Sequence, residues 1–168
     1  MSGDILTKIT IWIAILGYAS GTVAFALSRN NHQRDSLSRI ARLAWTVAMI
    51  ALLAHVFCAF HFYHAWSEGV AYRETARQTN EVFGLNWGGG LYINYALIVG
   101  WIVDVGWWWA RGVDSYRQRP RLLTAVWHGF LIFIIFNATV VFKIGLVRWV
   151  GLCVCLGLCL AWWHALRD

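Results

Sequence analysis

The stretch AHVFCAFHFYHAWSE, residues 54–68, gathers side chains that can bind metals or transfer protons into an otherwise apolar run. It contains His55, His61, His64 and Glu68. If the stretch forms one helix, the last three are spaced i, i+3 and i+7 and share one face. Two imidazoles and a carboxylate on one face are suitable ligands for Zn²⁺, Fe²⁺ or a copper ion. The alternative is that interfacial histidines hydrogen-bond water, headgroups or neighbouring side chains, and the sequence leaves both interpretations open.

His55 cannot join such a site, because the step of nine positions from His55 to His64 turns a helix by about 180° net. A single imidazole in hydrocarbon can instead be an axial ligand of b-type haem, with a second histidine on a facing helix. His128 is the candidate for that second ligand, although the estimated depths of the two histidines differ by roughly 9 Å. The alternative is that His55 is neutral and hydrogen-bonded to Asn137 or to a backbone carbonyl.

Asp104 is the costliest side chain to bury, because a carboxylate inside an apolar span needs a partner. His128 falls at about the same depth and is the predicted partner, with His164 as a further candidate nearby. The pair would serve as a proton relay, as a ligand with an orienting carboxylate, or as a structural bridge between helices, and we favour the bridge. Together with Asn137, Asp104 and His128 form the predicted set of intramembrane polar residues.

The elements that position these residues are predicted to be membrane-spanning helices. Of the 168 residues, 60% are hydrophobic and 13% are charged, which is about half the charged fraction of an ordinary soluble domain. Five apolar stretches are each near the ~20 residues that a helix needs to cross the hydrocarbon core. The sequence therefore predicts an all-α integral membrane protein, a single domain over residues 1–168 that forms a five-helix bundle. The expected spans are residues 9–27, 41–63, 91–110, 122–142 and 145–165.

A shorter helix is expected between the second and third spans. Ser67 can cap its N-terminus and Gly84 can end it. Glu74 can pair with Arg77 or Gln78 one turn later. We expect this helix on the outer face of the membrane, where it can continue the second span.

The distribution of arginine predicts the orientation. The loops after the first and third spans are basic, whereas the segment between the second and third spans is not. Because lysine and arginine collect in cytoplasmic loops, the N-terminus is expected outside and the C-terminus in the cytoplasm, in the inner membrane if the source is a bacterium. The basic loops contain Arg29, Arg34, Arg39, Arg42, Arg111, Arg117, Arg119 and Arg121.

Several classes of function find no support. The chain has no G-x-S-x-G motif, and its four cysteines fall within apolar spans, where packing is their expected role. No motif that enters a nucleic-acid groove is present, so no nucleic-acid partner is expected. The sequence shows no inverted repeat of the kind found in secondary transporters.

The predicted function is a small membrane protein that binds b-type haem or a transition-metal ion through intramembrane histidines, as a redox subunit of a larger complex. The main alternative is a non-catalytic accessory subunit whose buried polar residues only pack the helices. A third hypothesis is a metal-dependent enzyme that works through His61, His64 and Glu68. The expected partners are the lipid bilayer and either other protein subunits or further copies of the chain, and the sequence defines neither a substrate nor catalytic residues.

Overall fold

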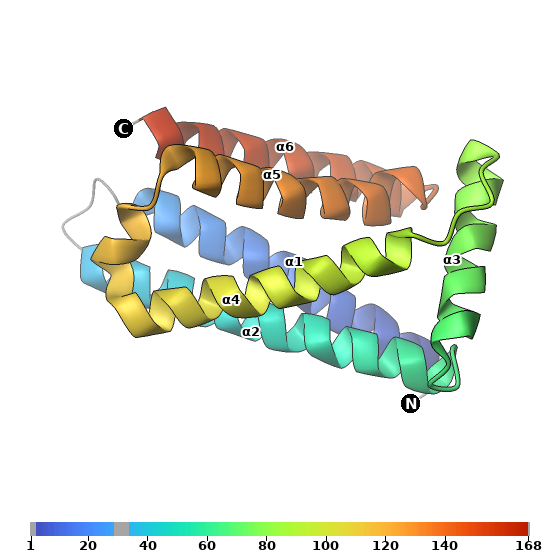
Figure 1. The fold of residues 1–168 in the computed structure, drawn as a ribbon. Helices are drawn as coiled ribbons and strands as arrows, with labels where there is room; N and C mark the ends of the chain where they lie inside the picture. Colours follow the sequence, from blue (N-terminus) through green and yellow to red (C-terminus); the bar gives the residue numbers. More distant parts are fainter. Residues whose placement is uncertain (1–2, 29–33, 168) are drawn as a thin grey trace.

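The computed structural model describes residues 3–28 and 34–167, with the side chains of Arg34 and residues 164–167 excepted. Every regular element of this part of the chain is helical, as the composition predicts (Figure 1). His164 and Arg29, both named in the sequence predictions, lie outside the described side chains. The elements are α1 (Gly3–Leu27), α2 (Arg34–Phe62), α3 (Glu68–Phe83), α4 (Gly90–Arg117), α5 (Arg121–Phe136), the π-helix η1 (Asn137–Val141) and α6 (Leu146–Arg167).

Five of these helices are long and apolar enough to cross a membrane, which confirms the prediction of five spans and supports an integral membrane protein. They lie side by side with alternating direction, and α3 lies across one end of the bundle (Figure 1). The first two helices begin earlier than their apolar runs, because polar residues can continue a helix beyond the hydrocarbon core. The spans are Gly3–Leu27, Asp35–Phe62, Gly90–Arg117, Arg121–Val141 and Leu146–Trp163.

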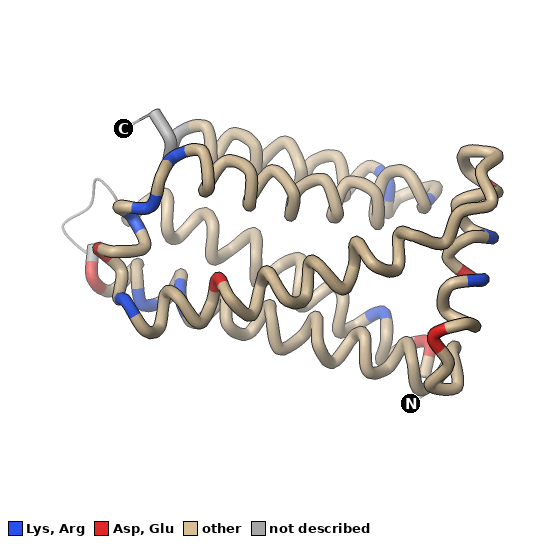
Figure 2. The backbone as a smooth tube through the Cα atoms, viewed as in Figure 1, with Lys and Arg blue, Asp and Glu red and all other residues tan. Residues whose placement is uncertain are grey.

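The two ends of the bundle differ in charge (Figure 2). We call one the basic end; it holds the C-terminus of α1 and the N-terminus of α2, together with the loop from α4 to α5. Arginines of α2, of the end of α4 and of the loop that follows it gather there, with few acidic residues between them. We call the other the α3 end; there, acidic and basic residues alternate around α3 and the N-terminus of α1.

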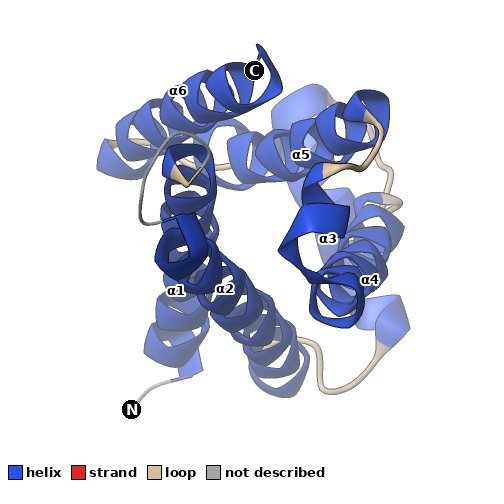
Figure 3. Ribbon diagram, turned by 90° about the vertical axis from the view of Figure 1, so that its left-hand side faces the viewer, coloured by secondary structure: helices blue, strands red, loops and turns tan. Residues whose placement is uncertain are grey.

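Helices α1 and α2 form the closest pair in the bundle (Figure 3). Gly17 and Gly21 of α1 form a G-x-x-x-G motif, which lets two helix backbones approach closely in a membrane. A Cβ atom added at Gly17 would come within 3.1 Å of the Ala48 Cβ, and one at Gly21 within 3.2 Å of the Ala41 carbonyl oxygen. Small residues on both helices therefore fix their spacing.

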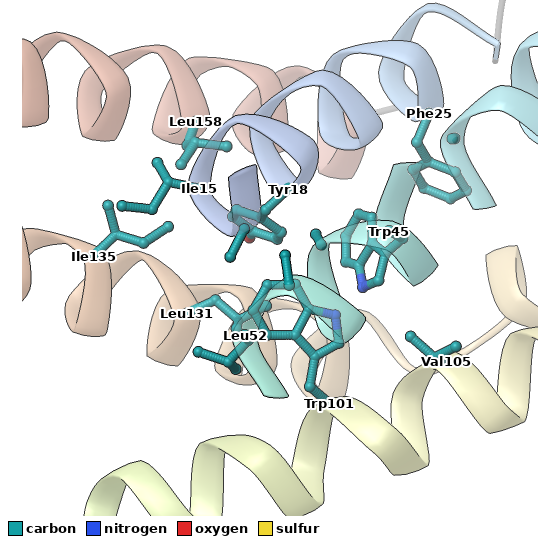
Figure 4. Close-up of a cluster of buried hydrophobic side chains, with 14 of the residues drawn as sticks. Ile15, Tyr18, Phe25, Trp45, Leu52, Trp101, Val105, Leu131, Ile135 and Leu158 are labelled. Atoms are coloured by element: carbon teal, nitrogen blue, oxygen red, sulfur yellow. The ribbon is translucent and has the colours of Figure 1, made fainter. Parts of the chain in front are cut away.

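An aromatic core joins this pair to the other spans (Figure 4). Tyr18 of α1 is fully buried and meets Trp45 of α2 and Trp101 of α4 edge to face, at centroid distances of 5.1 and 5.7 Å. Rings prefer this arrangement because their edges are positive and their faces negative. Leu131 of α5 and Leu158 of α6 complete the core, so all five spans contribute to it.

Helix α4 changes direction at Gly112, whose φ of 77° and ψ of 176° interrupt the helix. This backbone conformation is essentially restricted to glycine. Beyond it, the Tyr116 ring returns to the bundle and stacks on Trp108 of the same helix, with centroids 4.1 Å apart. The segment that was expected to be an ordinary basic loop therefore folds back and covers the basic end.

The short helix α3 forms where the sequence places it, with both predicted caps. The Ser67 side chain accepts a hydrogen bond from the Val70 N–H, and Gly84 adopts the left-handed conformation at the C-terminus. The expectation that α3 can continue α2 is wrong. Helix α2 ends at Phe62, and a turn in which Ala65 and Trp66 have positive φ separates the two helices.

Candidate functional site

The predicted metal ligands His61, His64 and Glu68 do not share a helix face. The prediction assumed one continuous helix, but α2 ends at Phe62, so His64 lies in the turn and Glu68 is the first residue of α3. Among the described residues, no three histidine, cysteine or acidic side chains come together in a way that would hold a metal ion. The turn between α2 and α3 is the physical reason, since it removes the helical spacing on which the site depended.

Each of these three residues has other neighbours. The His61 ring lies beside Phe57 and Trp66, at centroid distances of 6.2 and 6.4 Å, and these two rings also contact each other. The His64 ring meets Phe60 edge to face. The Glu68 carboxylate lies beside Tyr92 at the start of α4. The last contact helps to hold α3 against the bundle.

His55 forms the bond to a backbone carbonyl that the sequence offered as the alternative to haem ligation. Its Nδ1 lies 2.9 Å from the Thr7 carbonyl oxygen of α1. A carbonyl can only accept, so Nδ1 donates and Nε2 is left as the acceptor nitrogen of the ring. Asn137 does not take part, because its amide donates to the Phe133 carbonyl of its own helix at 2.7 Å.

His128 lies in the aromatic core with only 1% of its surface exposed. Its Nδ1 is 3.1 Å from the Tyr18 hydroxyl oxygen. One face of the imidazole stacks on Trp162 at a centroid distance of 3.6 Å, and Trp45 meets it edge to face at 5.1 Å. These contacts join α5 to α1, α2 and α6. No hydrogen-bond partner for Nε2 is found among the described residues.

Asp104 pairs with Arg119 and not with His128. Its carboxylate accepts from the Arg119 guanidinium and, at 3.0 Å, from the Tyr116 hydroxyl. Asp104 and Arg119 are 5% and 8% exposed, so the ion pair is buried. The Arg119 guanidinium also lies over the Tyr116 ring, 3.7 Å from its centroid. The predicted partner is different because the turn at Gly112 brings the following loop back over the end of the bundle.

Sequence reasoning assigned Arg119 to a basic loop and overlooked this role. A signal was present: Asp104 lies close to the expected end of its span. A long arginine side chain from the next loop can extend along apolar surface to reach such a depth. The sequence held no comparable signal for the roles of Tyr18, Tyr116 and Trp162. An aromatic residue in a span can equally well be buried in the core or face the lipid.

The π-helix η1 was not predicted either. A π-helical turn inserts one extra residue into a helix and often lies at a functional position. Here it brings Thr139 against Gly151 of α6, where an added Cβ would lie 2.2 Å from the Thr139 hydroxyl oxygen. The Thr139 hydroxyl donates to the Ile135 carbonyl at 2.7 Å. The irregular turn therefore supports close packing between α6 and the end of the fourth span.

At the basic end, further arginines connect elements that are distant in sequence. Arg117 donates to the hydroxyls of Ser28 and Ser38, at 2.5 and 3.1 Å, and so joins α4 to the end of α1 and to α2. The Arg42 guanidinium of α2 lies 4.0 Å from the centroid of a Trp109 ring in α4. These contacts complete a network of polar bonds between helices.

At the α3 end the ion pairs between described residues are local, three or four positions apart on one helix. Arg77 pairs with Glu74 and Glu81 within α3. Hydrogen bonds from Arg77 and Gln78 lower the pKa of Glu74 to about 2. A cavity on this helix and the loop after it is lined by Tyr72, Arg73, Ala76, Arg77, Asn80 and Asn86.

No protein-family model matches the chain, and no curated protein or solved structure is significantly similar to it. The geometry must therefore carry the functional argument. Its clearest feature is that these buried polar side chains bond within the chain: His55 and His128 each bond to a group on α1, and Asp104 bonds to Tyr116 of its own helix and to Arg119 in the loop that follows.

Proposed function

We propose that this chain is a non-catalytic subunit of a membrane complex, in which the intramembrane polar residues hold the helices together. The buried pair of Asp104 and Arg119 carries the proposal. A carboxylate in a span is expensive unless it is paired, and this one is satisfied by a guanidinium and a hydroxyl from its own chain. His55 and His128 add bonds from α2 and α5 to α1.

A second candidate, binding of b-type haem or a metal ion, has one observation in its favour. The Nδ1 of His55 donates to a carbonyl, which is the tautomer that an Nε2 ligand to a metal uses. The surroundings of the proposed second ligand do not fit a haem. An axial histidine reaches haem iron through Nε2, and the Nε2 of His128 is buried in the aromatic core, in a residue that is only 1% exposed. We therefore prefer the structural role.

The α3 end offers the surface that would meet a protein partner. The cavity on α3 is lined by Tyr72, two arginines and two asparagines. Tyrosine and arginine are among the residues that most often dominate binding energy at protein interfaces. Trp66 and Trp87 beside α3 are more than half exposed, and they would lie at headgroup depth.

The same charge distribution supports the proposed orientation. The basic end would face the cytoplasm and the α3 end the opposite side, because positive residues are retained in cytoplasmic loops. The N-terminus would then be outside and the C-terminus inside, in the inner membrane of a bacterial source. A partner at α3 would accordingly be an extracytoplasmic or membrane protein.

The test of the structural role is the absorption spectrum and metal content of the detergent-purified chain, measured together with its thermal unfolding. We expect neither a Soret band nor stoichiometric metal, and a large loss of stability when Arg119 is replaced. A Soret band that disappears in His55→Ala or His128→Ala would replace this proposal with haem binding. Metal that disappears in His61→Ala/His64→Ala would favour a metal site at the α3 end.

The partner surface can be tested in cells of the source organism by site-specific photo-crosslinking. A crosslinking amino acid at Asn80, in the cavity on α3, should give one defined protein adduct. The matched position is Val103, which is 60% exposed on a membrane span and should give none. Identical adducts at both positions, or none at Asn80, would contradict a partner at α3. The internal structural role would then be decided by the absorption, metal and unfolding measurements alone.

A further inference from the structure

A cavity of about 210 Å³ opens at the basic end between the first turns of α2 and the bend in α4. A water molecule occupies ~30 Å³ in the liquid, so the cavity has room for a group as large as a phosphate. Its lining is positively charged on balance, with two arginines and one carboxylate. The residues that line it are Asp35, Ser38, Arg39, Arg42, Trp108 and Val113.

The arginines in this cavity are positioned by contacts with α4. Arg42 lies over the Trp109 ring at 4.0 Å, and the Trp109 indole N–H in turn donates to the Thr46 hydroxyl at 3.0 Å. These two contacts hold the Arg42 guanidinium in place before any ligand binds. Arg39 lines the cavity and is exposed, and it has no hydrogen bond to another described residue, so its donors are available to a ligand.

Two further residues frame the site. Ser38 lines the cavity and accepts from Arg117 at 3.1 Å, so a third guanidinium lies beside the lining without being part of it. Trp108 contributes ring surface to the lining, while its indole nitrogen is buried away from the cavity. Asp35 opposes anion binding and leaves the lining itself with a single net positive charge.

An exposed apolar stripe begins on α2 one turn beyond Arg39 of the cavity. Leu43, Val47 and Ile50 follow the first turns of α2 at helical spacing, and each is more than half exposed. A ligand with acyl chains could lay them along this stripe while its polar group occupies the cavity. Basic pockets between spanning helices on the cytoplasmic side are typical binding sites for anionic headgroups.

We infer that the cavity binds the phosphate of an anionic phospholipid, with Arg39 and Arg42 as its principal ligands and the acyl chains along α2. Guanidinium groups suit this role because their donors match two phosphate oxygens at once. The inference concerns the basic end and does not depend on the proposed partner at α3.

The experiment is a lipid titration of the delipidated, detergent-purified full chain, read by native mass spectrometry. Phosphatidylglycerol should bind with an affinity at least tenfold higher than phosphatidylcholine, because two positioned cations act on its net charge. In Arg39→Ala/Arg42→Ala this preference should disappear. The matched control, Arg111→Ala/Arg121→Ala, removes the same charge from exposed positions at the same end that do not line the cavity, and should stay within about twofold of the unaltered chain.

The remaining outcomes are also decisive. An equal loss of the preference for phosphatidylglycerol in both double variants would show that binding depends only on the total charge of this end. It would overturn the proposed binding site. Displacement of phosphatidylglycerol by inorganic phosphate at millimolar concentration would show that the free anion is the ligand and overturn the lipid assignment. If Arg39→Ala/Arg42→Ala does not fold, Arg39→Ala alone serves, since that exposed side chain has no bond to another described residue to lose. Unchanged binding in Arg39→Ala would then count against the inference.

Discussion

The two ends of this bundle use the same kinds of charged residue in opposite ways. At the basic end, Arg119 reaches a carboxylate 15 positions away, and Arg117 reaches hydroxyls 79 and 89 positions away. At the α3 end, Arg77 pairs with glutamates three and four positions away on its own helix. The bonds of Arg117 and Arg119 connect separate segments of the chain, whereas the pairs of Arg77 stay within one helix.

The difference in burial gives these contacts different energetic weight. The side chains of Arg119 and Asp104 are each 4% exposed, so removing one leaves an uncompensated charge in a medium that cannot solvate it. The side chains of Arg77 and Glu81 are 56% and 57% exposed, and water and salt replace most of what their contact provides. An arginine in a membrane protein can thus set the orientation of the chain, stabilise the fold, or simply be solvated. How deeply its side chain is buried determines whether it stabilises the fold.

The largest effect is expected from Arg119→Leu. It leaves the Asp104 carboxylate buried without its cation, which should cost about 3–5 kcal/mol of unfolding free energy. Thermal unfolding in detergent measures the loss, with Arg121→Leu at an exposed position as the control. The double variant Asp104→Leu/Arg119→Leu should lose less than Arg119→Leu alone, because no lone charge remains. Equal stability of Arg119→Leu and Arg121→Leu would show that the buried contact at the basic end contributes no more to stability than an exposed arginine does.

Gly112→Ala tests whether the turn in α4 sets up the buried pair. The backbone there has a φ of 77°, which an alanine adopts only at a cost of about 1–3 kcal/mol. We expect a lower Tm and faster hydrogen exchange in residues 113–119. The control is Gly106→Ala, where an added Cβ meets nothing within 4 Å. Identical behaviour of the two alanine variants would indicate that the turn tolerates other conformations.

Ser67→Ala at the other end removes the cap of α3. The cap bond is long, 3.4 Å from the Val70 nitrogen, so we expect the low end of the usual range, about 0.5–1 kcal/mol. The loss should be confined to α3 and appear as faster hydrogen exchange there, with unchanged Tm of the bundle. A fall in the bundle Tm as large as that of Gly112→Ala would mean that α3 is not an independent element.

The smallest effect is expected from Glu74→Gln. The pKa of this carboxylate is lowered to about 2 in the folded chain by its bonds to Arg77 and Gln78. Its contribution is therefore complete above the unfolded pKa of ~4.3 and is lost as the pH falls toward 2. Because the side chain is 35% exposed, solvent limits the contribution to about 0.3–0.5 kcal/mol. Protection factors of the α3 amides, which are intrinsic exchange rates divided by observed rates at the same pH, should fall from pH 6 to pH 3 by a smaller factor in Glu74→Gln than in the unaltered chain.

The fold was largely predictable because a bilayer restricts what a chain can do. Apolar length alone identified five spans, and Ser67 and Gly84 correctly bounded α3 because caps act locally. The candidate site was less predictable, since partners depend on how helices end and turn. Two positive-φ residues at the end of α2 removed the proposed trio of His61, His64 and Glu68, and one glycine in α4 gave Asp104 a partner that helical depth could not indicate.

The pairing of Asp104 with Arg119 also bears on how the chain enters the membrane. The cation is encoded just beyond the same span, so the third transmembrane segment brings its own counter-ion and need not await a later helix. As soon as residue 119 has left the ribosome, the segment can neutralise its carboxylate and pack against the second span. The third span, which its carboxylate would otherwise make unfavourable to insert, can therefore enter the membrane before the later helices have been synthesised.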